Sequence, residues 1–277
     1  MQGTGNKFTV FHEFVAKHFD ESAIDELRLY IGPQKFIYIA LTDGIILAAK
    51  SFHYKRPSSV LFHIDILDQI MDIAERLLSL SPSKVEVYYN TNDFTFVPNE
   101  LFDLNSIKEL LGFNTSTINL IPQHRTIASQ GMTCVFGIPK YIDAFIHKHW
   151  KNAQIHFGSE KMFDLLPINK DENQIYIHIE KGEFDLYIYK DQKLNLYNSF
   201  EFANKEEFAY YLLFVLEKMG ANPETVPVYM LGDIKEDSEY YNIIYKYLRY
   251  VRIVEPKSMH RNDIEDIIFH DMIKIYF

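Results

Sequence analysis

The sequence contains a single cysteine and no apolar run near the length needed to cross a membrane. With only Cys134, an intramolecular disulfide and a zinc site built from several cysteines are excluded, and the chain suits a reducing compartment. A membrane-spanning helix needs about 20 consecutive apolar residues, which no run approaches. The opening residues lack a basic stretch followed by an apolar core, so we expect no secretory signal and a cytoplasmic location.

Positive charge is also scarce. The chain has 28 Lys and Arg against 38 Asp and Glu, a formal net charge of −10. This balance opposes nonspecific attraction to nucleic acid or anionic membranes, so we expect neither among the partners. With 277 residues, 47% of them hydrophobic, the chain can fill one large domain or two of ordinary size.

Residues 174–234 show the pattern around which the rest of the chain is organised. Three β-rich runs, QIYIHI, FDLYIY and LNLYNSFEF, are separated by polar or glycine-containing turns. The run from Glu206 to Met219 has the apolar spacing of a helix and ends at Gly220, and VPVYMLGDI follows as a strand. The order βββαβ, with the last strand returning beside the first, opens a ribonuclease H-like α/β domain.

A similar set of elements begins at Glu26, where the pair Asp43-Gly44 predicts a hairpin turn. An offset of 148 relates the two meanders, and an offset of 141 relates the elements that follow: Ile31 falls on Ile179, Phe36 on Phe184, Leu67 on Phe208 and Tyr88 on Tyr229. A connection seven residues longer in the first copy, within residues 53–63, would explain the change. We interpret the chain as an internal duplication.

Weaker patterns predict the remaining elements. They are a short helix over Val10–Phe19, an extended FTFVP segment, a helix from about Asn99 to Leu111, a polar passage over residues 123–130, a strand, helix, strand and helix over residues 132–167, a helix beginning near Ser238, the strand YVRIV and a mixed tail from Ser258. We expect residues 1–170 to form the first subdomain, with an N-terminal extension and a strand-helix-strand-helix insert. Residues 171–277 form the second.

Two ribonuclease H-like halves in tandem resemble the actin-like ATPase superfamily, which includes sugar kinases, Hsp70 chaperones and pilus-assembly proteins. The stretch CVFGIPKYIDAFIHKHWKNAQIHFGSEKMFDLLP is similar to an insert of the pilus-assembly members. PNELF, IPKYI and EEFAYYLLFVLEKMG followed by VYMLGDI resemble an uncharacterised bacterial domain-of-unknown-function family associated with the actin-like fold. The resemblance implies an α/β protein of duplicated βββαβαβ subdomains, and its motifs are structural rather than catalytic.

Active members of that superfamily carry an Asp-x-Gly turn after the first strand of each half, where Asp holds hydrated magnesium and Gly admits phosphate. The matching first turn, Ile31-Gly32-Pro33-Gln34, lacks a carboxylate, and its proline removes one N–H donor. The second, Glu180-Lys181-Gly182, keeps the glycine and has Glu for Asp. The adenosine-side Leu-x-Gly-Gly pattern is matched by residues 230–233, with Asp233 replacing the second glycine.

The resemblance therefore implies a set of cofactor-contacting positions: Gly32, Gln34, Glu180, Gly182, Gly232 and Asp233. The competing interpretation is that these residues only form ordinary surface turns. No catalytic residue or metal site is assigned. We predict a noncatalytic pseudo-ATPase that acts through a protein partner, with a degenerate nucleotide cleft between its halves. The alternative is a divergent ATPase or sugar-type kinase that binds ATP and magnesium there.

Four further patterns are weaker candidates. Carboxylates at Glu180, Glu206 or Glu207, and Asp233 suggest a two-metal nuclease, but the first strand offers His178 instead of Asp, and the net charge is unfavourable. His147 and His149, two apart on a helix, diverge and cannot share a metal in the usual way. Cys134 in an apolar strand is expected to be a buried inert thiol. The tyrosines of residues 240–250 suit core packing or a protein-binding face.

Overall fold

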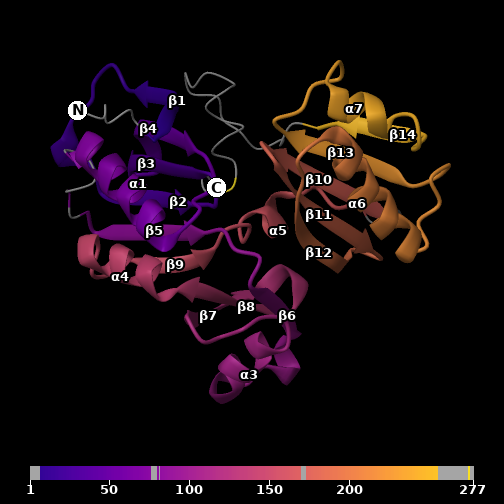
Figure 1. Cartoon of the computed structure of the whole chain (residues 1–277), viewed down its shortest axis with the longest axis horizontal. Helices are drawn as coiled ribbons and strands as arrows, with labels where there is room; N and C mark the ends of the chain where they lie inside the picture. Colours follow the sequence, from indigo (N-terminus) through magenta and orange to yellow (C-terminus); the bar gives the residue numbers. More distant parts are fainter. Residues whose placement is uncertain (1–6, 76–79, 81, 170–172, 255–273, 275–277) are drawn as a thin grey trace. The chain divides into compact units, whose positions relative to one another are not determined.

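The computed structural model describes residues 7–75, 80, 82–169, 173–254 and 274. The chain separates into two compact units (Figure 1). The first contains the described residues up to Asp164 together with Lys274, and the second begins at Leu165. The three sheets are distributed so that no strand is shared between the units. The domain boundary at residue 170 remains a prediction.

The first unit is built on a six-stranded mixed sheet. In spatial order its strands are β1 (Phe8–Val15), β4 (Ile45–Tyr54), β3 (Lys35–Thr42), β2 (Glu26–Ile31), β5 (Lys84–Tyr89) and β9 (Gln154–Phe157). Strands β2, β3 and β4 form an antiparallel meander, whereas β5 and β9 extend the sheet from β2 in parallel. Helix α1 (Val60–Ile73) begins at Ser59, whose hydroxyl accepts a hydrogen bond from the Phe62 amide.

A smaller three-stranded sheet is inserted between β5 and β9 in the chain. Its strands are β6 (Phe94–Pro98), β8 (Met132–Pro139) and β7 (Leu120–Ile127) in spatial order, accompanied by the helical turns η2 (Asn99–Leu101) and η3 (Leu104–Ser106) and helix α3 (Ile107–Gly112). Helix α4 (Lys140–His149) then leads into β9, and the short helix α5 (Met162–Leu165) follows. Of the stretch that resembles a pilus-type insert, β8 therefore lies in the small sheet and β9 in the large one.

The second unit contains a five-stranded sheet. Its spatial order is β12 (Lys193–Glu201), β11 (Glu183–Lys190), β10 (Gln174–Glu180), β13 (Pro227–Gly232) and β14 (Tyr250–Ile253), with helices α6 (Lys205–Lys218) and α7 (Glu239–Ile244). One face of β10 carries Ile175, Ile177 and Ile179 into the core. The apolar stripe of α6, which includes Phe208 and Leu212, packs against this face.

The internal duplication is visible in the strand order. The series β4-β3-β2-β5-β9 in one unit repeats as β12-β11-β10-β13-β14 in the other. Ile31 pairs with Phe36, and Ile179 pairs with Phe184, so the offset of 148 holds through the meanders. The hairpin turns also correspond, because Asp43 and Asp191 both have a positive φ, +48° and +49°.

The predicted offset of 141 for the following elements is wrong. The capping residues Ser59 and Asn204 occupy the same place before α1 and α6, an offset of 145 (204 − 59). In the next strand, Ile31 pairs with Tyr89 where Ile179 pairs with Gly232, an offset of 143 (232 − 89). The connection after the first meander is thus three residues longer than its counterpart (148 − 145), rather than seven.

Three predicted elements of the first half differ from the structure. Instead of a helix at Val10–Phe19, β1 pairs antiparallel with β4, so sheet hydrogen bonds override a helical spacing of apolar residues. The helix expected from Asn99 to Leu111 is broken into η2, η3 and α3. The polar passage at residues 123–130 is mostly strand β7, which pairs with β8. The tail predicted from Ser258 lies outside the described residues except for Lys274.

A helix must be both long and apolar to cross a membrane. Among the described residues, no helix meets both requirements.

Candidate functional site

The turn after β2 contains the first two predicted contact residues, Gly32 and Gln34. The Gly32 amide donates to the Lys35 carbonyl at 2.9 Å, and Pro33 has no amide hydrogen. The Tyr54 hydroxyl closes the turn by donating to the carbonyls of Gly32 at 2.8 Å and Lys35 at 3.1 Å. The Gln34 carbonyl accepts from the Tyr54 amide at 2.9 Å. The Gly32 amide is therefore already engaged within the turn.

Close packing explains the glycine at position 32. A Cβ atom there would lie 2.7 Å from the Cε1 atom of Tyr30, whose ring is fully buried. The ammonium group of Lys35, which is 7% exposed, lies 5.0 Å from the centroid of the same ring. The resemblance implies that Gly32 lets phosphate approach, and its contacts add a packing role beside Tyr30.

The second turn joins β10 to β11 through Lys181 and Gly182. Gly182 has φ +77°, and its carbonyl accepts from the Phe202 amide at 3.0 Å. The Glu180 side chain is only 11% exposed, and one of its carboxylate oxygens lies 3.7 Å from Nδ1 of the fully buried His178. Glu180 is therefore a largely buried carboxylate close to an imidazole nitrogen.

The third position, Gly232-Asp233, lies directly beside Glu180, because Ile179 pairs with Gly232 on the neighbouring parallel strand. Gly232 has φ +94°, and a Cβ atom there would lie 2.2 Å from the Ile179 carbonyl oxygen and 3.1 Å from the His178 ring. The Asp233 amide donates to the Ile179 carbonyl at 2.8 Å. Two strands thus approach each other more closely at this point than a side chain would permit.

The structure therefore brings four predicted residues to one edge of the second sheet: Glu180, Gly182, Gly232 and Asp233. This is the edge at the carboxyl ends of parallel strands, where α/β sheets commonly bind ligands. Gly32 and Gln34 lie at the corresponding edge of the first sheet. The amides of Gly32, in the predicted phosphate turn, and of Asp233, in the adenosine-side pattern, both donate within the chain.

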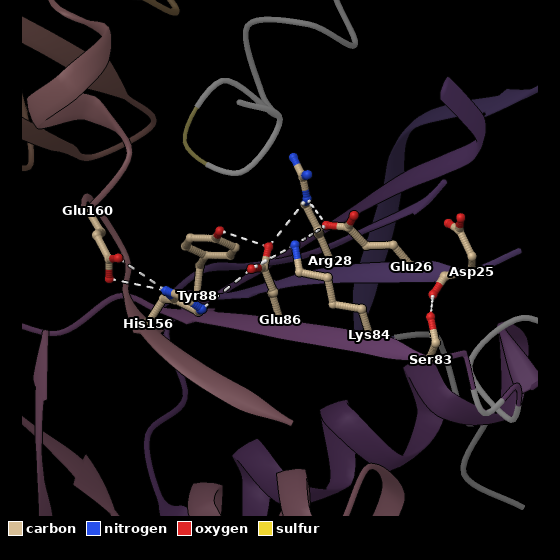
Figure 2. A network of polar contacts seen from close by, with 9 residues as sticks. All are labelled: Asp25, Glu26, Arg28, Ser83, Lys84, Glu86, Tyr88, His156 and Glu160. Atoms are coloured by element: carbon tan, nitrogen blue, oxygen red, sulfur yellow. Dashed lines mark hydrogen bonds and ion pairs between the residues drawn. The ribbon is translucent and has the colours of Figure 1, made fainter. Parts of the chain in front are cut away.

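A network of charged side chains, which the sequence did not predict, crosses three parallel strands of the first unit (Figure 2). Its pairs lie directly opposite each other: Glu26 and Lys84, Arg28 and Glu86, Tyr88 and His156. Nζ of Lys84 lies 3.1 Å from Glu26 and 3.0 Å from Glu86. The rings of Tyr88 and His156 stack with centroids 4.8 Å apart.

Glu86 is the centre of this network and is only 6% exposed. Burial alone would raise the pKa of its carboxyl, but the hydrogen bond from Lys84 and the charges of His156, Lys84 and Arg28 together lower that pKa below the ordinary value. The Tyr88 hydroxyl donates to the same carboxylate at 3.2 Å. Nδ1 of His156 lies 3.2 Å from Glu160. The carboxylates and cations are mutually paired, which suits a structural link between strands more than a reactive centre.

The described residues contain no cluster of three or more His, Cys, Asp or Glu arranged to hold a metal ion. A period-two pattern of polar residues could have revealed the network, since Glu26 and Arg28 alternate on β2 as Lys84 and Glu86 do on β5.

The sequence matches the family described as "Protein of unknown function (DUF3822)" over residues 64–251. The chain belongs to this family. No curated protein matches it. The matched range runs from within α1 of the first unit to the start of β14 in the second, so it spans parts of both units.

Solved structures share the fold. A protein from Bacteroides thetaiotaomicron, described as having an actin-like ATPase fold and unknown function, is 21% identical with a TM-score of 0.75, over 87% of this chain and 95% of that one. The PilM-PilN type IV pilus biogenesis complex contains a chain with 11% identity and a TM-score of 0.59, over 92% and 98%. The ethanolamine utilization protein EutJ from Carboxydothermus hydrogenoformans has 10% identity and a TM-score of 0.50, over 90% and 88%.

These similarities establish the architecture of the DUF3822 chain. It is an α/β protein with the actin-like ATPase fold, and its two mixed sheets agree with duplicated ribonuclease H-like subdomains. The predicted resemblance to an uncharacterised bacterial family with this fold, distantly similar to pilus-assembly proteins, is confirmed.

The weaker sequence candidates also have defined positions. Cys134 is fully buried in β8, and burial raises the pKa of its thiol well above the ordinary value, as expected for an inert cysteine. His147 lies on α4 with Nδ1 2.9 Å from the Asp143 carbonyl oxygen. Of the tyrosine-rich run, Tyr245 and Tyr247 are more than half exposed, whereas Tyr240 contacts the core of the second unit.

Proposed function

We propose that this chain is a noncatalytic protein of the actin-like fold that acts by binding a protein partner, and that its nucleotide site is degenerate. The observation that carries the proposal is the turn Gly32–Lys35. It has no carboxylate to position magnesium, its proline lacks an amide hydrogen, and its glycine amide already donates to Lys35. Phosphoryl transfer depends on such amides and on a positioned metal ion to stabilise developing charge.

The second sheet edge supports the same proposal. Glu180 and Asp233 place two carboxylates at neighbouring strand ends, and two negative charges disfavour a triphosphate unless a cation accompanies it. Gly232 permits the close approach of β13 to β10, which accounts for a glycine at this position without a nucleotide.

For a noncatalytic protein of this fold, the function that we infer is the binding of a protein partner. The PilM-PilN complex is named as an assembly of two proteins, and its fold is similar to this one. We extend only that mode of action, protein binding, to the present chain. The proposal retains a cytoplasmic location and the two subdomains of residues 1–170 and 171–277.

Calorimetric titration with ATP and magnesium, followed by a phosphate-release assay, tests the proposal. We expect neither heat of binding at micromolar ATP nor turnover above the buffer control. The alternative, a divergent ATPase or sugar-type kinase, predicts micromolar binding and hydrolysis. Hydrolysis that is abolished in Glu180→Ala and retained in the matched variant Glu201→Ala, an exposed carboxylate of the same sheet, would overturn the noncatalytic assignment.

A further inference from the structure

A pocket of about 710 Å³ lies in the second unit, at the end of the sheet opposite to Glu180 and Gly232. It is formed by the amino ends of β10, β13 and β14, the carboxyl end of β11, and the segment that follows α6. We call it the strand-end pocket. Its volume is within the range of roughly 300–1,000 Å³ typical of ligand sites.

Four lining residues form one row across the sheet. Gln174 pairs with Tyr189 and Pro227 pairs with Tyr250, and the register of β10 with β13 brings Gln174 level with Pro227. Tyr189 is fully buried, whereas Tyr250 is 50% exposed, so the row leads from the interior to solvent. Met219 and Ala221, after α6, add an apolar wall. The pocket thus offers tyrosine rings and apolar side chains along a line that crosses four strands.

The charge of the pocket is opposite to that of the protein. The chain has a net charge of −10, yet the described residues that line the pocket include Lys190 and Arg252 and no Asp or Glu. These two cations are on β11 and β14, separated by β10 and β13. Adjacent strands are about 4.8 Å apart, so the two backbones are roughly 14 Å apart across the sheet. An extended chain that crosses the strand ends can place one carboxylate beside each cation.

A buried donor supplies an independent indication of a ligand. Gln174 is fully buried and lines the pocket. Its side-chain oxygen accepts from the Asn169 amide at 2.9 Å, whereas its Nε2 atom has no hydrogen-bond partner among the described residues. A buried donor without an acceptor costs about 1–3 kcal/mol, so the site gains from a ligand that brings a carbonyl or carboxylate oxygen.

We propose that the strand-end pocket binds an extended acidic peptide segment of a partner protein. Two carboxylates of the peptide contact Lys190 and Arg252, and an apolar side chain between them packs on Pro227 and Tyr250, the exposed end of the row. An extended chain advances about 3.3–3.6 Å per residue, so the two acidic residues are about four positions apart. The inference rests on the proposed function, for which it names the class of partner and the place where it binds.

Selection of a random peptide library displayed on phage against the full chain tests this proposal. We expect the enriched peptides to carry two acidic residues three to five positions apart. The tightest of them, synthesised with a fluorophore, is then titrated by fluorescence anisotropy. Each of Lys190→Gln and Arg252→Gln is expected to raise its Kd about fivefold, and the double variant about 25-fold. Both residues are exposed, so the fold is retained, which circular dichroism checks.

Lys235→Gln is the matched control, because it removes the same charge from an exposed residue that follows β13 at the opposite end of the sheet. It should leave the Kd unchanged. Selection that enriches no peptide, or peptides without acidic residues, overturns the proposal, as does binding that the double variant leaves intact. ATP hydrolysis by the chain would refute the proposed function and leave this result untouched, since the assay contains no nucleotide.

Discussion

Substitution of Gly232 by alanine tests whether the close approach of β13 to β10 is the reason for this glycine. The new Cβ atom would lie 2.2 Å from the Ile179 carbonyl oxygen, which belongs to the backbone of a central strand and cannot rotate away. The backbone must also keep φ +94°, which alanine rarely adopts. Positive φ costs roughly 1–2 kcal/mol and overpacking typically 1–3 kcal/mol, so we expect a loss of about 2–5 kcal/mol in unfolding free energy.

Gly220→Ala separates the two contributions. Gly220 also has a positive φ, +67°, but a Cβ atom there would meet nothing within 4 Å. Only the conformational cost of roughly 1–2 kcal/mol applies. Hydrogen exchange of β10 and β13, measured by mass spectrometry, reports on the second unit, and the fluorescence of Trp150, the single tryptophan, reports on the first. Equal losses in the two variants would refute the steric argument.

Three further predictions concern other features. Gln192 has φ +66° in the β11–β12 hairpin, so Gln192→Gly should stabilise the second unit by about 0.5–1 kcal/mol in urea unfolding, whereas Lys193→Gly should not. Burial lowers the pKa of His63 from 6.5 to about 4. Because the unfolded chain then takes up a proton that the folded chain does not, the free energy of unfolding should fall as pH decreases from 6.5 towards 4, by about 1–2 kcal/mol at pH 5. A His63→Leu variant that kept this pH dependence would contradict the assignment. Glu86→Gln should destabilise the first unit by about 1–3 kcal/mol at pH 7, measured by Trp150 fluorescence, and the difference from the wild type should shrink as pH falls through the lowered pKa of Glu86.

The meanders could be predicted because their signals are local. Alternating apolar residues and the pair Asp43-Gly44 define a hairpin within a few residues, and the register of Ile31 with Phe36 follows from it. The second meander repeats the pattern with Asp191 in the same turn conformation. The offset of 148 was therefore correct.

The helix and the strand after each meander were aligned incorrectly for a physical reason. An error of four residues in α6 is about one helical turn, and an error of two residues in β13 is one strand period, so both keep the same face buried. Apolar periodicity cannot distinguish such alignments. The N-cap residues Ser59 and Asn204 mark the same position before α1 and α6, so aligning them would have corrected the offset of the helices.

Nonlocal contacts account for what the sequence did not predict about the site. Gly232 was interpreted through a nucleotide pattern, because only the pairing of β13 with β10 reveals the Ile179 carbonyl next to it. In the same way, the ion pairs of Glu86 depend on the alignment of three parallel strands from distant parts of the chain. Strand β1 was missed because its hydrogen bonds are made with β4, some forty residues later.

The pairing of β1 with β4 determines which strand forms the edge of the large sheet in the first unit. An edge strand presents unpaired amides and carbonyls to other molecules, and in the first unit β1 takes that position and covers β4. At the corresponding edge of the second unit, no described strand lies beyond β12, which instead exposes Lys193, Asn195 and Asn198 to solvent. Shortening the chain to begin at β2 would therefore leave β4, most of whose residues are buried, as the edge strand, and the first unit should aggregate while the second would not change.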